Sequence, residues 1–316
     1  MISFIVIGKN EERNLFKCIS SINETIKINK IVDCEIIYID SDSTDYSIEI
    51  IKSFKNVMAF KIKGDINAAL ARNVGAKKSI GDILFFIDGD MELIPENFKQ
   101  YYENGKLIGG EYIAGNFYHC LYHDNTLISK ELYSTVTKDS NKTLAGGMFL
   151  INRDLWFKNN GMRTCFRRSQ DYDLAMRMAK SGNKILLRST PLALHHTIDY
   201  NYFGRFTKDL FTGNFFYQIL LIKYNLFNKY IIPEVMREIT LMILILSMAL
   251  VYISSNTIYL SLYLFSILLK LIYKKRIKEI VKYLYIYIAL DICGFLSFFI
   301  FWPKSVKRKN YQIIRA

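Results

Sequence analysis

The first hundred residues alternate between short apolar runs and stretches with apolar residues at helical spacing. Four apolar runs predict buried strands, at residues 2–7, 35–39, 57–61 and 83–87. The stretches between them predict helices, at residues 11–26, 47–54 and 66–79. Strands that alternate with helices favour a mostly parallel sheet with helices on both faces, so we expect an α/β fold.

The pattern is less regular between residues 101 and 200. Residues 171–181 predict a helix that stops at Gly182, and residues 185–187 predict a short strand. From residue 199 the composition shifts toward aromatic residues interspersed with basic ones. Such a mixture is typical of a segment at lipid headgroup level, although an amphipathic helix packed on the preceding domain would look the same. We therefore expect one domain over residues 1–200 and an amphipathic interfacial connector over 201–238.

Two long apolar stretches follow the connector. Residues 239–272 carry Lys270 as their single formal charge, and Ser254-Ser255-Asn256 at the middle offers a turn. A single span needs about 20 residues, so this stretch predicts a hairpin of two short spans; the alternative is a buried helix pair in a soluble protein. A third apolar segment, about 283–302, contains Asp291 and Gly294. We expect residues 239–316 to form a membrane-associated helical region that ends in a basic tail.

The net charge of +13 is unevenly distributed over the 316 residues. One basic cluster lies at residues 274–282 and another at 304–309, and both flank apolar segments. This placement favours a membrane surface, and no nucleic-acid-binding motif is present. The positive-inside rule favours both clusters on the cytoplasmic side, with a hairpin and a re-entrant or interfacial third segment. Five scattered cysteines indicate a reducing compartment, and the first residues do not resemble a signal peptide.

Two carboxylates, Asp88 and Asp90, follow the predicted strand 83–87 directly. Open α/β sheets bind ligands just outside the carboxyl ends of their strands. Two hard oxygen ligands there suit Mg²⁺ or Mn²⁺ shared with a substrate phosphate, whereas the alternative is an acidic turn.

Polar residues also follow other predicted elements. Residues 40–45, which run from Asp40 through Asp42 to Asp45, either contact a nucleobase edge or simply cap the next helix. Arg72 lies in an Ala-rich helix and either reaches a phosphate as a forked donor or is a solvated helix charge.

A last group of candidates lies beyond residue 168. Asp171 begins a predicted helix, where it acts either as a general base on an acceptor hydroxyl or as compensation for the helix dipole. Asp173 and Arg177 are spaced for a helix pair. The neighbouring residues His195 and His196 either complete a metal shell or are packing features.

These motifs occur in a familiar order. The segments are Gly8-Lys9-Asn10-Glu11, Asp40 to Asp45, Ala71-Arg72-Asn73-Val74-Gly75, Asp88-Gly89-Asp90, and Gln170-Asp171. Over roughly residues 1–200 this order resembles the family 2 glycosyltransferases, which have the nucleotide-sugar-binding GT-A fold. The resemblance implies a GT-A domain with a mostly parallel twisted sheet flanked by helices, followed here by the C-terminal membrane region.

The resemblance also implies roles for individual residues. Asp171 deprotonates the acceptor hydroxyl, and Gln170 replaces an acid that the family often has. Asp40 contacts the donor base, and Asp88 and Asp90 bind the ribose and a divalent metal, Mg²⁺ or Mn²⁺, with Asp90 as the direct ligand and His196 as a further one. The rest of the donor side is Gly8, Asn10, Glu11, Asp42 and Arg72. Gly146, Gly147, Met148 and Gln170 border the acceptor.

We therefore expect an inverting, metal-dependent glycosyltransferase that uses a nucleotide-sugar donor. The apolar C-terminal region suggests a membrane-associated acceptor, a polyprenyl-linked saccharide in surface polysaccharide or glycan synthesis, reached from the cytoplasmic face of a bacterial inner or plasma membrane. One alternative is a polyprenyl-phosphate glycosyltransferase. Another is a non-catalytic membrane protein that binds a nucleotide. A nucleotidyltransferase is disfavoured because Gly8-Lys9-Asn10-Glu11 is not a Gly-rich phosphate loop.

Overall fold

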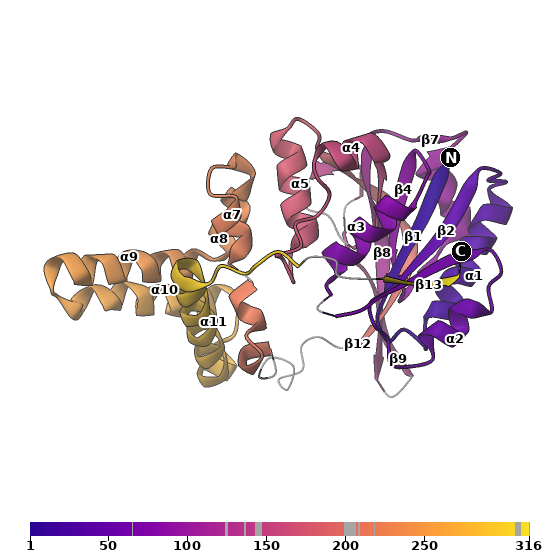
Figure 1. The fold of residues 1–316 in the computed structure, drawn as a ribbon. Helices are drawn as coiled ribbons and strands as arrows, with labels where there is room; N and C mark the ends of the chain where they lie inside the picture. The colour runs from indigo at the N-terminus through magenta and orange to yellow at the C-terminus, as the bar shows by residue number, and fades with distance from the viewer. Residues whose placement is uncertain are drawn as a thin grey trace. The chain divides into compact units, whose positions relative to one another are not determined.

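A computed structural model describes residues 1–64, 66–123, 126–135, 137–142, 147–198, 207, 209–217, 219–306 and 311–315. The chain forms two compact units (Figure 1). The first comprises Met1–Tyr202 together with Lys304–Ala316, and the second comprises Phe203–Pro303. Each unit is described by itself.

The first unit is built on one large sheet. Its strand order is β10 (Ser140–Lys142), β12 (Ile185–Ile198), β8 (Tyr112–His123), β11 (Phe149–Asn152), β4, β1, β2, β3 and β13 (Tyr311–Arg315). The four predicted strands are β1 (Ile2–Gly8), β2 (Cys34–Asp40), β3 (Val57–Ile62) and β4 (Ile83–Asp88). They lie next to one another and are parallel, which confirms the expected α/β fold. Their apolar residues are almost completely buried because helices cover both faces of this part of the sheet.

Five helices cover the two faces. They are α1 (Leu15–Ile28), α2 (Ser47–Lys52), α3 (Ala68–Lys78), α4 (Arg153–Lys158) and α5 (Gln170–Lys180). Figure 1 shows α1 and α2 on one face and α3, α4 and α5 on the other. The helix α3 is Ala-rich because it lies very close to the sheet; a Cβ atom on its Gly75 would overlap the Ile5 side chain. As predicted, α5 stops before Gly182, whose φ of +94° suits glycine.

The region with an irregular pattern contains more strands than the sequence predicts. Its elements are β5 (Met91–Leu93), η1 (Pro95–Gln100), β6 (Tyr102–Glu103), β7 (Lys106–Leu107), β8 (Tyr112–His123), β9 (Thr126–Leu132), β10 (Ser140–Lys142), β11 (Phe149–Asn152) and β12 (Ile185–Ile198). The strand β12 is much longer than the predicted 185–187. It continues past Pro191 because register shifts on both sides of this proline let it stay paired with β8.

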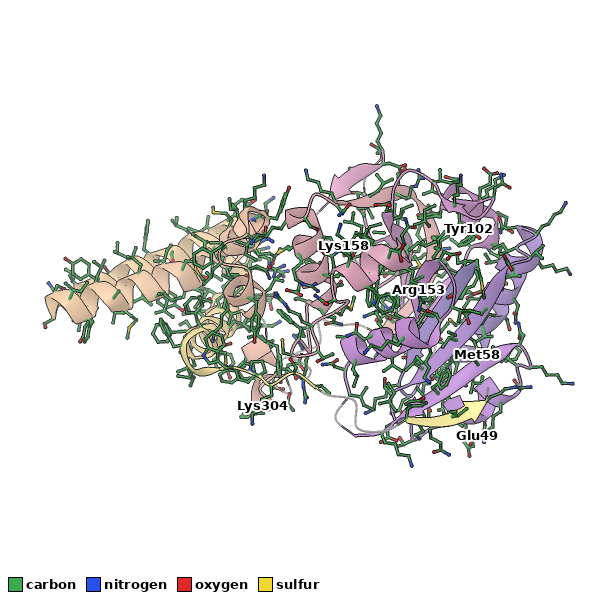
Figure 2. All side chains as sticks on the ribbon, turned by 45° about the horizontal axis from the view of Figure 1, so that its top comes forward. Glu49, Met58, Tyr102, Arg153, Lys158 and Lys304 are labelled. Atoms are coloured by element: carbon green, nitrogen blue, oxygen red, sulfur yellow. The ribbon has the colours of Figure 1, made fainter. Side chains whose placement is uncertain are left out.

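The end of the chain returns to the first unit. Residues 303–316 were expected to be the basic tail of the membrane-associated region, but Tyr311–Arg315 form β13, antiparallel to β3. Figure 2 labels Met58 on β3 beside this last strand. The Arg315 guanidinium donates to the carbonyls of Lys52 and Phe54, and Lys78 Nζ donates to Tyr311 Oη. An edge strand gains stability from a partner on its open side, and the local pattern of 303–316 does not reveal that partner.

The second unit is helical. Its elements are η2 (Asn214–Tyr217), α7 (Leu220–Tyr224), η3 (Lys229–Ile231), α8 (Ile232–Arg237), α9 (Ile239–Ser254), η4 (Thr257–Tyr259), α10 (Leu260–Tyr273), η5 (Ile277–Glu279) and α11 (Ile280–Ile300). The helices α9 and α10 form the hairpin that the apolar pattern predicts, joined at Ser255 and Asn256. Among the described residues, α11 is the one helix long and apolar enough to cross a membrane, and the pair Lys229–Arg237 and Ile239–Ser254, bent by 86°, passes the same test together.

Candidate functional site

The candidate site lies at the carboxyl ends of the parallel strands. In the sheet register Gly8 of β1 pairs with Asp40 of β2, and Ile7 pairs with Asp88 of β4. Three motifs that are far apart in the sequence therefore end side by side. Parallel strands bring their carboxyl ends to one edge, where such sheets bind ligands.

The loops that follow β1 and β2 are hydrogen-bonded to each other at this edge. Asn10, with φ of 58°, donates its backbone N–H to Ser43 Oγ at 2.9 Å and accepts from the Thr44 N–H through Oδ1 at 2.9 Å. Asp40 is fully buried, and its Oδ1 accepts from the Ser43 N–H at 2.9 Å. Asp42 lies on the same loop, 3.4 Å from Lys61 Nζ. The hydrogen bond with Ser43 gives Asp40 a structural role, and the contact of Asp40 with a donor base remains a prediction.

Arg72 is buried, which excludes the alternative of a solvated helix charge, and its contact with a donor phosphate stays a prediction. Its side chain is 2% exposed, and Nη2 lies 2.6 Å from Asp88 Oδ1 and 3.1 Å from the Gly147 carbonyl oxygen. A buried forked donor that touches both groups orients the Asp88 carboxylate against the Gly147 backbone. Arg72 therefore acts on Asp88, and the sequence pattern could not show this because the partners come from three separate segments.

Gly147 leaves no space for a side chain beside Asp88. A Cβ atom there would overlap Asp88 Oδ2 and approach Arg72 Nη2 to 3.3 Å. We predict that Gly147→Ala lowers kcat/KM by about 10²-fold, because it displaces a carboxylate at the reacting site. Gly110→Ala is the matched control, since a Cβ atom there meets nothing within 4 Å and its activity should stay at the wild-type level. Equal activities of the two variants would contradict the role of this contact.

The histidine beside Asp90 is His195, not the expected His196. His195 Nε2 lies 3.1 Å from Asp90 Oδ2, and its Nδ1 lies 3.2 Å from Nδ1 of His119 on β8. His196 instead places Nε2 2.8 Å from Glu92 Oε2. Neighbouring strand residues point to opposite faces of a sheet, so only one of the two rings can meet Asp90. The sequence did not predict β12 as far as residue 198 and so could not choose between them.

The carboxylates at this edge are crowded. Glu11 lies close to Gly89, and burial, followed by the charges of Asp90 and Asp88, raises the pKa of Glu11 to about 8. Asp90 Oδ1 is buried and has no hydrogen-bond partner among the described residues. Among the described residues, no group of three His, Cys, Asp or Glu side chains is arranged so that it could hold a metal ion by itself. Two carboxylates with one open oxygen fit Mg²⁺ or Mn²⁺, which usually take their remaining ligands from substrate phosphates and water.

Asp171 and Asp173 have different surroundings although they lie two residues apart at the start of α5. Burial raises the pKa of Asp171 to about 6, partly opposed by the charge of Arg72. Asp173 is fully buried, with Oδ1 2.9 Å from Arg163 Nη1 and Oδ2 2.9 Å from Arg177 Nε. The expected pair of Asp173 with Arg177 is confirmed, and the role of Asp171 as a general base stays a prediction.

The structure describes three of the four residues predicted on the acceptor side. Gly147 lies at the site, and Gln170 Oε1 is buried without a hydrogen-bond partner among the described residues. Gly146 lies outside the residues that the structure describes. Met148 is fully buried in the hydrophobic core, so its side chain does not face the site. His119 was not predicted as a site residue. Alternation along residues 112–123 would have placed its side chain on the same face as those of Phe117 and Leu121.

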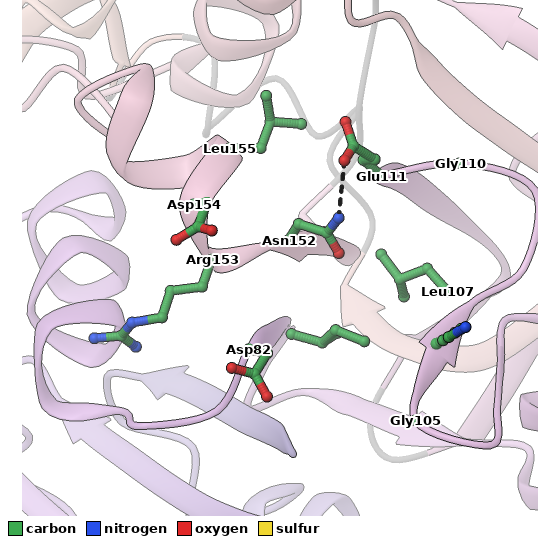
Figure 3. A pocket seen from close by; sticks show the side chains of 11 residues that line it. Asp82, Gly105, Leu107, Gly110, Glu111, Asn152, Arg153, Asp154 and Leu155 are labelled. Atoms are coloured by element: carbon green, nitrogen blue, oxygen red, sulfur yellow. Dashed lines mark hydrogen bonds between the residues drawn. The ribbon is translucent and has the colours of Figure 1, made fainter.

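A separate pocket lies at the opposite edge of the sheet. It has a volume of about 510 Å³ and is lined by residues near the start of β4 and the end of β11 (Figure 3). Asn152 Nδ2 donates to Glu111 Oε1 at 3.2 Å, and Arg153 Nη1 donates to Ser79 Oγ at 2.8 Å. These groups bind one another, and β4 runs from this pocket to Asp88 at its far end, so the pocket is not part of the candidate site.

The family and the fold are shown by similarity to known proteins. The family model described as "Glycosyl transferase family 2" matches residues 3–178. The poly(ribitol-phosphate) beta-N-acetylglucosaminyltransferase TarP of Staphylococcus aureus (strain N315) is 33% identical over 121 residues. That match covers 37% of this chain and 36% of TarP, so it spans about a third of this relative.

Two solved structures are similar in fold. S. aureus TarS 1–349 in complex with UDP has a TM-score of 0.51 at 14% identity and covers 72% of this chain and 65% of that chain. GalNAc-T7 with UDP, GalNAc and Mn²⁺ has a TM-score of 0.51 at 15% identity, with 65% and 44% covered. These likenesses show the fold. Because the family model spans more than half of the chain, the protein belongs to glycosyl transferase family 2.

Proposed function

We propose that this protein is an inverting transferase that moves a sugar from a nucleotide-sugar donor to a hydroxyl of a membrane-associated acceptor. The meeting of Arg72, Asp88 and the Gly147 carbonyl at the sheet edge where β1, β2 and β4 end carries the proposal, with Asp171 in the first turn of α5 as the candidate base. Inversion needs one base beside the acceptor hydroxyl and neutralised charge on the leaving diphosphate. One edge of the sheet supplies candidates for both.

Asp171 is the proposed base. A pKa near 6 leaves this carboxylate ionised at pH 7 while it keeps more basicity than an exposed aspartate. The acceptor proton passes to the Asp171 carboxylate as the acceptor oxygen bonds to the anomeric carbon and the bond to the diphosphate breaks. The nucleoside diphosphate leaves with the electron pair of that bond.

The donor side is proposed to comprise Gly8, Asn10, Glu11, Asp40, Asp42 and Asp88, with Arg72 as the residue that positions Asp88. Asp90 and Asp88 would hold Mg²⁺ or Mn²⁺, and His195 replaces His196 as the neighbouring imidazole. A bound divalent ion supplies charge neutralisation to the diphosphate. The Mn²⁺ and UDP named for GalNAc-T7 support this assignment for a protein of the same fold.

The test of the proposal is a transfer assay with purified full-length protein in detergent. UDP-GlcNAc is the first donor to try, because the name of TarP is that of an N-acetylglucosaminyltransferase and a TarS structure holds UDP. We expect donor binding to raise the melting temperature by mass action and UDP to be released when acceptor is present. If a panel of nucleotide sugars gives neither stabilisation nor release, with Mn²⁺, with Mg²⁺ or without a metal, the chain is not a transferase.

The two histidines give a prediction on metal dependence. We expect His195→Ala to raise the Mn²⁺ concentration for half-maximal activity by about 10-fold or more, within the range found when a residue that orients a metal ligand is lost. His196→Ala is the matched control, because its ring contacts Glu92 and Tyr122 instead of Asp90. A Mn²⁺ titration of both variants checks this. An unchanged half-maximal concentration in His195→Ala would refute the assignment.

The acceptor is proposed to be a hydroxyl of a polyprenyl-linked saccharide. The name of TarP favours one further candidate, a hydroxyl of a ribitol-phosphate polymer. The polyprenyl-phosphate alternative differs in chemistry, because a lipid phosphate is already ionised and needs no strong base. Parallel assays with the three acceptor types separate them, and transfer to free polyprenyl phosphate that survives Asp171→Asn would favour the last.

A further inference from the structure

The return of the chain end to the first unit constrains how the second unit meets a membrane. The polypeptide leaves the first unit after residue 202 and rejoins it at residue 304. Val306 is bound there, because its carbonyl accepts from Thr164 Oγ1 at 2.8 Å, and β13 pairs with β3. Both ends of the second unit are therefore tied to the same catalytic unit. The number of membrane crossings between them has to be even, and this depends only on chain connectivity.

The α9–α10 hairpin contributes an even number by itself. Its helices pack side by side in opposite directions, with Leu244 of α9 against Ile267 and Leu271 of α10. Lys270 Nζ lies 3.1 Å from Thr240 Oγ1 at the open end of the hairpin. Packed antiparallel helices enter the bilayer together, so they cross twice or not at all. It follows that α11 cannot supply a single crossing, although its length and composition would permit one.

The contacts of α11 agree with this conclusion. The first half of α11 contacts the open end of the hairpin through Lys270, whose Nζ lies 4.8 Å from the centre of the Tyr287 ring. The Arg276 guanidinium, just after α10, lies 4.7 Å from the centre of the Tyr283 ring. Figure 1 accordingly shows α11 running across the α9–α10 pair rather than along it.

Residues further along α11 also contact α9 at the open end of the hairpin. Asp291 Oδ1 accepts from Thr240 Oγ1 at 3.2 Å, and a Cβ atom on Gly294 would approach Leu241 Cδ2 to 2.7 Å. The carboxylate also accepts at 3.2 Å from Oη of Tyr263, a long side chain that starts near the tip end of α10. Because the short Thr240 side chain at the base also reaches it, Asp291, the one acid of α11, lies nearer the base of the hairpin than its tip, where a charged group does not have to reach the bilayer centre.

We propose that the second unit is an anchor in a single leaflet: α9–α10 inserts as a hairpin from the side of the catalytic unit, and α11 lies across its base at headgroup depth. Helices of 16 and 14 residues are about 24 and 21 Å long, shorter than the hydrocarbon core of about 30 Å. This proposal rests on the membrane attachment that the proposed function assumes.

The surface of the second unit fits a phospholipid leaflet. Large apolar side chains are exposed on both hairpin helices, for example Tyr252 at 89% and Phe265 at 60%, and Figure 2 shows side chains standing out around this pair. At the open end Lys274, Lys275, Arg276 and Lys278 are exposed, which suits anionic headgroups. At the tip, Asn256 Oδ1 accepts from the Ile258 N–H at 2.9 Å, so the turn satisfies polar groups that lipid could not.

Single cysteines on the full chain, with the five native cysteines replaced, test this topology in sealed vesicles of both orientations. Val32→Cys marks the catalytic face because Val32 is 95% exposed. We expect an impermeant maleimide to label Lys278→Cys and Lys304→Cys from the same face as Val32→Cys, and to label Ser255→Cys from neither. Labelling of Lys278→Cys from the opposite face would overturn the position of α11. Labelling of Ser255→Cys from that face would overturn the single-leaflet hairpin.

The wild-type protein provides a second measurement that needs no substitution. Trypsin should cut at residues 274–278 in vesicles that expose the catalytic unit and leave this segment intact in the opposite orientation; the reverse result overturns the proposal. Protein that washes off vesicles at high salt and high pH would also overturn it. Glycosyl transfer is measured separately in detergent. A result that contradicts the membrane anchor can therefore be told apart from one that contradicts the proposed transferase activity.

Discussion

Asp171→Asn is expected to lower kcat by about 10²–10⁴-fold while the variant still binds the nucleotide-sugar donor. The substitution keeps the shape of the side chain and removes the group that accepts the acceptor proton. Single-turnover transfer measures the rate, and donor-induced thermal stabilisation measures binding. Asp154→Asn is the matched control, since Asp154 also lies in the first turn of a helix of this unit but away from the site. A kcat near that of the control would exclude Asp171 as the base.

The same residue sets the expected pH dependence. Its pKa is raised from the usual 3.8 to about 6, chiefly by burial. The base works only when ionised, so kcat/KM should rise about tenfold per pH unit below pH 6 and level off above it. Because the folded pKa exceeds the unfolded value, ionisation in the folded state costs stability as pH rises through this range. Asp171→Asn should therefore melt at a higher temperature than wild type at pH 7 and lose that advantage toward pH 4.

Asp173→Ala is expected to lower the free energy of unfolding of the first unit by about 3–5 kcal/mol, the range for breaking a buried ion pair. Asp173 is fully buried between the guanidinium groups of Arg163 and Arg177, so its loss leaves two cations without this anion. Arg177 also donates to the carbonyls of Asn159 and Gly161 at 2.6 Å each, so the loop that precedes α5 should loosen as well.

Urea denaturation followed by Trp156 fluorescence measures this effect, because Trp156 is 1% exposed in the core of the first unit. Asp33→Ala is the control, since Asp33 is exposed and the change there should stay within about 0.5 kcal/mol. Two aspartates two residues apart are thus predicted to change stability in opposite directions. Equal unfolding midpoints for Asp173→Ala and the control would contradict the buried pair.

Much of the fold could be predicted because its signals are local. The strands β1 to β4 are compact apolar runs, and the helices between them carry apolar residues at helical spacing. Acids directly after a parallel strand are expected at the sheet edge, so Asp40 and Asp88 could be placed together before their contacts were known. The helix that begins at Gln170 was predicted to within a residue because its stop at Gly182 is a local backbone signal.

Other features depend on partners distant in the sequence. Whether His195 or His196 faces Asp90 follows from the register of β12 on β8. Arg72 is held against Asp88 with the help of the Gly147 carbonyl, 75 residues away, which accepts from the same Nη2. The arrangement proposed for α11 rests on β13, whose pairing with β3 joins the last residues of the chain to a strand at residues 57–62.

The sequence by itself determined the order of the elements over the first hundred residues, the sheet edge where the candidate site lies and the family. These depend on apolar periodicity and on short motifs read within a few residues. Only the tertiary structure decided which histidine meets Asp90, what Arg72 binds and where the last strand lies. Each of these depends on which distant backbone segment supplies the neighbouring surface, and side-chain spacing along the chain carries no information about that.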